Sequence, residues 1–147
     1  MEGQSVTILA NGATHPNKTV SSGTITLDRA ATKVHVGLSY ISLLKTMRVE
    51  SPGNESTSQS KTKRINEVTL RLHETVGVEV GASLTDMERI PFRSSAAAMD
   101  TAVPLFTGDK QVEFRDDFNT DGFVFVRQNQ PLPLTLIALY PQITIND

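Results

Sequence analysis

The sequence predicts an all-β protein: an antiparallel sandwich or a barrel, with long polar loops and at most one short helical turn. Apolar residues alternate with polar ones in several short segments, with the period of two that is typical of half-buried strands. No segment of ten residues keeps a helical apolar period free of glycine and proline. The one helical turn that we expect lies around Ser83–Arg89, where Ser83 or Thr85 would cap it.

The first strands are expected close to the N-terminus. Ser5–Ala10 and Thr24–Leu27 are short and rich in β-branched residues. The stretch between them contains Asn-Gly at 11–12 and His-Pro-Asn at 15–17, which favour turns. We therefore predict a hairpin whose arms are joined by a long loop.

The next segment, Lys33–Tyr40, shows the clearest alternation. Its even-numbered positions form an apolar set on one face, made up of Val34, Val36, Leu38 and Tyr40. Polar residues such as Lys33 and His35 fall on the other face. This pattern predicts a strand with one buried face.

The segment Asn66–Val80 admits two interpretations. Part of the segment has apolar residues at helical spacing, but Leu70 would then lie off the apolar face of the helix. Gly77 and Gly81 also weaken a helix. We favour two strands. The first has Val68, Leu70 and Leu72 on one face, and the second contains Val76, Val78 and Val80.

Three further strands are predicted in the C-terminal part. Gln111–Phe114 alternates, and Phe123–Val126 is an unbroken apolar run, as expected of a strand covered on both faces. Leu132–Tyr140 is apolar and begins with Pro131 and Pro133. Because proline cannot donate to a ladder, this end should lie at an edge or at a strand entry.

The domain organisation that we expect is an N-terminal hairpin arm at residues 1–30, continuous with a main β domain at residues 31–147. Two polar stretches, Asn11–Thr19 and Glu50–Lys63, are expected to be loops.

Composition excludes several classes of function. Fourteen Lys and Arg against sixteen Asp and Glu give a net charge of −2, unlike a dedicated nucleic-acid binder. There is no cysteine for disulfides, thiolate zinc sites or a thiol nucleophile. No apolar run is long enough to span a bilayer, and the first residues do not resemble a signal peptide. We expect a soluble protein that is not secreted, without a cofactor.

Residues Asp117–Gly122 match the first six positions of a calcium-binding loop. The match then fails, because Gln128 stands where a bidentate glutamate is required and both flanks are expected to be strands. We favour a hairpin connection that ends in the turn Asp121-Gly122, and we assign no metal site.

No catalytic residue is assigned either. His15, His35 and His73 belong to no known catalytic or metal motif, and the adjacent Asp116 and Asp117 would point to opposite faces of a strand. An enzyme such as a glycan hydrolase is therefore disfavoured.

The basic cluster Lys61-Thr62-Lys63-Arg64 has two possible roles. It could meet phosphate, an anionic glycan or an acidic partner. We favour a solvated strand entry, because such a cluster is common on surfaces.

Three groups of residues resemble the C-terminal region of a family of large tail proteins of short-tailed bacteriophages, known as tail tubular protein B, nozzle protein or phage stabilisation protein. They are residues 2–16, 23–27 and 34–40; residues 61–65 and 68–72; and residues 90–94, 104–110, 121–122 and 130–135. The most specific are Ile90-Pro91-Phe92-Arg93-Ser94 and Gln130-Pro131-Leu132-Pro133-Leu134-Thr135.

The resemblance implies a non-enzymatic structural component of the phage tail, located in the virion. It further implies a ring of copies of the chain, sixfold by analogy with the family, that docks other tail proteins such as fibres or the tail tube. In such a ring we expect the loops Asn11–Thr19 and Glu50–Lys63 to contact neighbouring subunits, and deleting Pro52–Ser60 should impair assembly and leave the subunit folded. The alternative is a module at the distal tail that binds a glycan or protein of the host surface.

Overall fold

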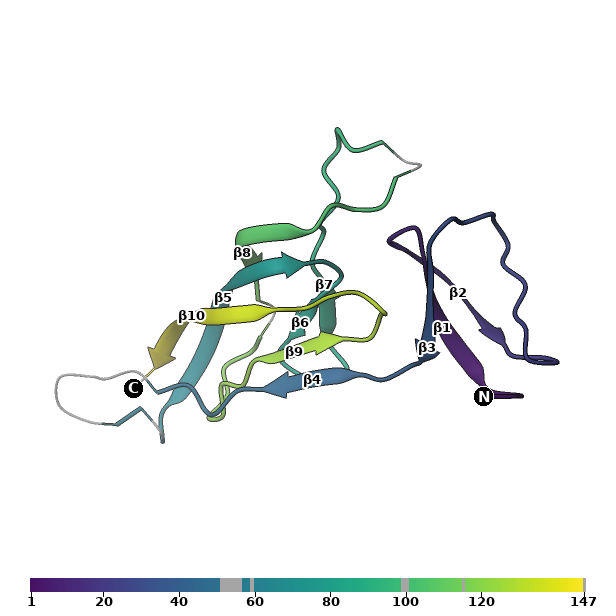
Figure 1. Ribbon diagram of the computed structural model, residues 1–147. Coiled ribbons are helices and arrows are strands. Elements are labelled where there is room, and N and C mark those ends of the chain that lie inside the picture. The colour runs from purple at the N-terminus through teal and green to yellow at the C-terminus, as the bar shows by residue number, and fades with distance from the viewer. Residues whose placement is uncertain (51–56, 59, 99–100, 115, 147) are drawn as a thin grey trace.

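The computed structural model describes residues 1–50, 57–58, 60–98, 101–114 and 116–146. This part of the chain contains ten strands and no helix, arranged in three antiparallel sheets that do not close into a barrel (Figure 1). The all-β prediction is therefore confirmed. The helical turn expected around Ser83–Arg89 is wrong, because residues 83–86 form a bend and Met87–Arg89 is a strand.

The N-terminal sheet has the order β2-β1-β3, with β1 at Ser5–Ala10, β2 at Ala13–Thr19 and β3 at Val34–Leu38. The predicted hairpin partner of β1, Thr24–Leu27, is not a strand, although Thr24 makes one isolated bridge with Ser21. The hairpin is instead formed by β1 and β2, so Asn11–Thr19 is mostly strand and not a loop.

A two-residue turn at Asn11 and Gly12 explains this correction. Their φ angles are 51° and 79°, the left-handed values that tight hairpins require and that Asn-Gly adopts readily. Pro16 is compatible with β2 because this strand lies at the sheet edge, where a missing N–H is tolerated.

The second sheet has the order β10-β5-β8, with β5 at Thr62–Thr75, β8 at Phe106–Glu113 and β10 at Leu136–Asn146. Strand β10 begins three residues after Pro133 and occupies an edge, as the prolines predicted. Strand β5 ends near Glu74 and Gly77, both with positive φ. The preferred division of 66–80 into two strands is therefore confirmed, but the second strand begins only at Glu79, so it contains Val80 and neither Val76 nor Val78.

The third sheet has the order β4-β9-β6-β7, with β4 at Ser42–Lys45, β6 at Glu79–Gly81, β7 at Met87–Arg89 and β9 at Phe125–Gln128. Gly81 is required by close packing, since an added Cβ would lie 1.9 Å from the carbonyl oxygen of Asp86. The apolar run 123–126 is buried on one face only, because Val124 and Val126 are buried and Phe123 and Phe125 are half-buried.

The second and third sheets share one apolar core, as the two layers of a sandwich do. Their facing side chains include Ile65, Val68, Leu70 and Leu72 from β5, and Val78, Val80, Val124 and Val126 from the third sheet and its flanks. Burying each such side chain stabilises the fold by about 1.5–3 kcal/mol.

The N-terminal sheet lies to one side of this sandwich and is joined to it by residues 39–41 (Figure 1). Its own buried residues include Val6, Ile8 and Ala10 of β1. The boundary suggested near residue 30 falls inside this sheet, whose third strand ends at Leu38.

Candidate functional site

An exposed apolar segment runs from Val34 to Met47, and we call it the apolar ribbon. It comprises β3, the link at residues 39–41, β4 and the two residues that follow. Eight of its large apolar side chains are 38% to 87% exposed: Val34, Val36, Leu38, Tyr40, Ile41, Leu43, Leu44 and Met47. So many exposed large apolar side chains in one segment are uncommon on monomeric soluble proteins, and exposed apolar surface of this kind marks interaction sites.

The ribbon is exposed because both of its strands lie at sheet edges. Strand β3 has β1 as its neighbour on one side, and β4 has β9. Val34, Val36 and Leu38 continue the apolar row that begins in β1, where Val36 lies beside the buried Ile8. The alternation in β3 thus correctly predicts which side chains lie on the same face as the buried residues of β1. The predicted burial of Val34, Val36 and Leu38 is wrong, because these side chains are exposed at the edge of the sheet.

The charge of the ribbon and its flanks is uniformly positive. Between Asp28 and Glu50 the sequence has four Lys and Arg and no acid. Three of these cations contact their own subunit. The Lys45 ammonium lies 3.7 Å from the centre of the Phe123 ring, Arg48 is 2.8 Å from Asp121, and Arg29 donates to the Thr14 carbonyl at 3.5 Å. The ribbon is therefore suited to an apolar partner surface with negative charge.

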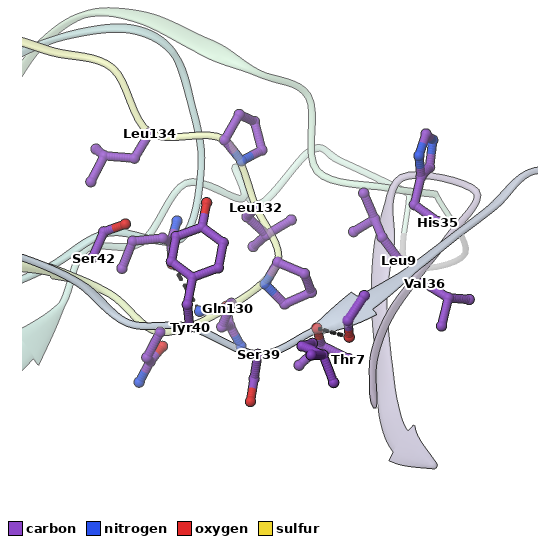
Figure 2. A pocket seen from close by; sticks show the side chains of 16 residues that line it. Thr7, Leu9, His35, Val36, Ser39, Tyr40, Ser42, Gln130, Leu132 and Leu134 are labelled. Atoms are coloured by element: carbon purple, nitrogen blue, oxygen red, sulfur yellow. Dashed lines mark hydrogen bonds between the residues drawn. The ribbon is translucent and has the colours of Figure 1, made fainter. Parts of the chain in front are cut away.

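A groove of about 460 Å³ separates the N-terminal sheet from the sandwich (Figure 2). One wall comes from β1, β3 and the link, including Thr7, Leu9 and Tyr40, and the other is the segment 128–134. Gln128 fixes that second wall: its amide donates to the Val76 carbonyl at 2.9 Å, and its side-chain oxygen accepts from the Gln130 N–H at 3.2 Å.

The three histidines are not brought together. His15 is buried, with Nδ1 2.8 Å from the Pro16 carbonyl and Nε2 accepting from the Asp28 N–H at 3.0 Å. These bonds give it a structural role. His35 and His73 are exposed on their strands, as expected, and His35 also lines the groove.

The calcium-like segment Asp117–Gly122 is folded around Asn119. The Asn119 side-chain oxygen accepts from the N–H groups of Asp121 and Gly122 at 2.9 and 2.7 Å. Its amide nitrogen donates to Asp116 at 3.0 Å. The segment is not the predicted hairpin turn, because the strands on either side, β8 and β9, belong to different sheets.

Lys63, in the basic cluster 61–64, corrects the interpretation of this cluster as a solvated strand entry. Its side chain is fully buried, and its ammonium donates to the Val49 carbonyl at 3.1 Å. Arg64 is exposed and Lys61 is half-buried. Of the proposed contact loop Glu50–Lys63, residues 51–56 and 59 lie outside the described part of the chain.

Sequence reasoning missed a cluster around the buried Glu79. Its carboxylate is 2.7 Å from Arg127 and 3.4 Å from Arg89, and Asn129 donates to it at 3.2 Å. Arg89 and Arg127 lie directly opposite Glu79 on the two neighbouring strands. The position of Glu79 between Val78 and Val80 could have indicated a buried carboxylate. Its partners could not be predicted, because they depend on which strands pair.

The comparisons with known proteins do not identify the chain: no protein-family model matches it, and no curated protein matches its sequence. Across the described ranges, no group of three or more His, Asp or Glu is placed to hold a metal ion. Those ranges also contain no helix that is long and apolar enough to cross a membrane.

Proposed function

We propose that this chain is a non-enzymatic structural subunit of a bacteriophage tail, which assembles with copies of itself and docks neighbouring tail proteins. The observation that carries the proposal is the apolar ribbon. Two consecutive edge strands expose apolar side chains, with no proline in either strand. Proteins that work as monomers cover or charge such edges, because these edges otherwise pair with other chains.

The architecture supports the same proposal. A stiff sandwich with a small additional sheet offers rigid surfaces to neighbours, and homo-oligomeric contacts are built from such repeated surfaces. The resemblance of residues 90–94 and 130–135 to the tail-protein family points to the tail as the assembly.

The proposal is tested by the mass of the native particle, measured by light scattering over a range of protein and salt concentrations. We expect a discrete multimer of the 16.0 kDa chain, visible as a ring by electron microscopy. A strict monomer at every concentration would contradict autonomous self-assembly. Immunogold labelling of tails in virions tests membership of the tail separately.

A host-surface binding module is the second candidate, and the groove in Figure 2 favours it. The groove combines the exposed ring of Tyr40 with the amide side chains of Asn129 and Gln130, a combination that suits a glycan. A glycan array separates the two functions, because a purely architectural subunit should give no glycan signal. Tyr40→Ala should abolish any signal that arises in this groove.

A further inference from the structure

We propose that the apolar ribbon of one copy docks head-to-tail into an acidic groove on a second copy of this chain. The contact rests on the proposed self-assembling function and adds the two surfaces that carry it. The acidic groove has a volume of about 330 Å³ and lies between the β6–β7 hairpin and the end of β8. Three carboxylates line it, those of Asp86, Glu88 and Glu113.

Four apolar residues also line the acidic groove: Val80, Ala82, Met87 and Phe114. Of these, Val80 and Phe114 are buried. Arg89 also lines the groove, but its guanidinium is 3.4 Å from Glu79 of its own subunit. The groove therefore offers three carboxylates together with the half-buried Ala82 and Met87, and its negative charge complements the positive flanks of the ribbon.

Among the described residues, no ion pair neutralises the three carboxylates of the acidic groove. Glu113 lies directly opposite Glu67 in the β5–β8 ladder, and neither forms an ion pair within the described ranges. Glu88 likewise has no ion-pair partner there. Like charges in opposite positions destabilise a sheet, so their presence points to a positive charge supplied from outside.

The ribbon supplies that charge together with apolar area. Lys33, the exposed residue directly before the ribbon, forms no ion pair with the described residues, and no acid lies between Asp28 and Glu50. An aromatic side chain buries roughly 150–250 Å², and seven other large apolar side chains of the ribbon are 38% to 87% exposed.

The ribbon and the acidic groove are made of different residues, and each copy carries one of each. A copy can therefore seat its ribbon in the groove of one neighbour and offer its own groove to another. Such a heterologous contact builds a ring if the rotation closes.

A mixing experiment tests this contact. The ribbon variant Tyr40→Glu/Met47→Glu changes side chains that are 79% and 87% exposed, and the groove variant Glu88→Lys/Glu113→Lys reverses two groove charges. We expect each variant alone to be monomeric. An equal mixture should give a dimer of twice the subunit mass and nothing larger, because one intact ribbon then meets one intact groove.

Two matched control variants test whether the loss of assembly is specific to the ribbon and the acidic groove. Ile137→Glu changes an apolar side chain of β10 that is 61% exposed, outside the ribbon, and Glu74→Lys reverses an exposed acid outside the groove. Both should retain the wild-type mass. Circular dichroism and thermal unfolding of every variant establish that the monomers are folded.

The outcomes separate this contact from the proposed function. A wild-type multimer that survives in either double variant overturns the contact and leaves self-assembly standing. A mixture that stays monomeric shows that the two surfaces do not meet each other. A wild-type chain that is monomeric at every concentration overturns both the contact and autonomous assembly, while tail labelling still decides membership of the tail.

Discussion

The main chains of Lys63 and Asn119 exchange two hydrogen bonds, of 2.7 and 2.9 Å, although Asn119 belongs to no strand. Above the buried Lys63 side chain, the segment 119–122 turns so closely that a Cβ on Gly122 would lie 2.9 Å from Lys63 Cδ. The Lys63 ammonium also donates to Val49, after β4. This one lysine therefore joins three segments that are distant in sequence, and the β8–β9 connection depends on it.

Asn119→Ala should destabilise the fold by about 1–3 kcal/mol, because the N–H groups of Asp121 and Gly122 lose their side-chain acceptor. Urea unfolding measures the change. Thr120→Ala, at an exposed neighbouring position, should change the unfolding free energy by less than about 0.5 kcal/mol. Equal effects of the two substitutions would argue against the role of the Asn119 side chain.

Gly122→Ala should cost more than Gly3→Ala, although both glycines have positive φ, of 59° and 73°. Each substitution places alanine in a left-handed conformation, which costs roughly 1–2 kcal/mol. A Cβ at Gly3 meets nothing within 4 Å, whereas at Gly122 it meets the confined Lys63 chain. Differential scanning calorimetry compares the stability of the two variants. An equal loss of stability would mean that the Lys63 side chain moves away from the new methyl group without cost.

Glu79→Ala should destabilise the subunit by on the order of 3 kcal/mol, since it leaves the partly buried Arg127 without its carboxylate. Glu79→Gln keeps a side-chain oxygen as acceptor and should lose less. Chemical denaturation gives both values. A neutral effect of Glu79→Ala would show that water replaces the carboxylate at Arg127.

The Asp109 carboxylate should titrate below its ordinary pKa of 3.8, because Arg71 donates a hydrogen bond to it and adds a favourable charge. The unfolded chain then binds the proton at a higher pH than the folded chain. The pair therefore contributes stability above about pH 3.8, and this contribution is lost as the pH falls through the lowered pKa.

Carbon-detected NMR of the Asp109 carboxyl checks this prediction. Arg71→Gln should return the Asp109 pKa toward its ordinary value. Asp28, whose pKa is lowered by a separate hydrogen bond from Lys18, is the internal control and should titrate unchanged. An Asp109 pKa that does not move in Arg71→Gln would show that the ion pair is not formed in solution.

The strands with buried side chains on one face could be predicted with good accuracy. Val68, Leu70 and Leu72 alternate because one face of β5 covers the core. The prolines before residue 134 predicted an edge or a strand entry, and β10, which begins at Leu136, is an edge strand. The prediction of the N-terminal hairpin was wrong because the Asn-Gly turn was interpreted as part of a long loop. Pro16 and the polar residues of β2 are not typical of a strand, so β2 was not predicted. At a sheet edge, where one row of main-chain groups needs no partner, such a composition is allowed.

The sequence by itself determined the all-β class, the apolar face of each core strand and the positive charge of residues 29–49, because periodicity and charge are local properties of the chain. Only the tertiary structure decided what covers those faces. Lys63 is buried because the segment 119–122 lies over it, and Val36 is exposed because no further strand pairs with β3. Burial depends on contacts between distant segments, and a period of two says which side chains share a face but not what lies against it.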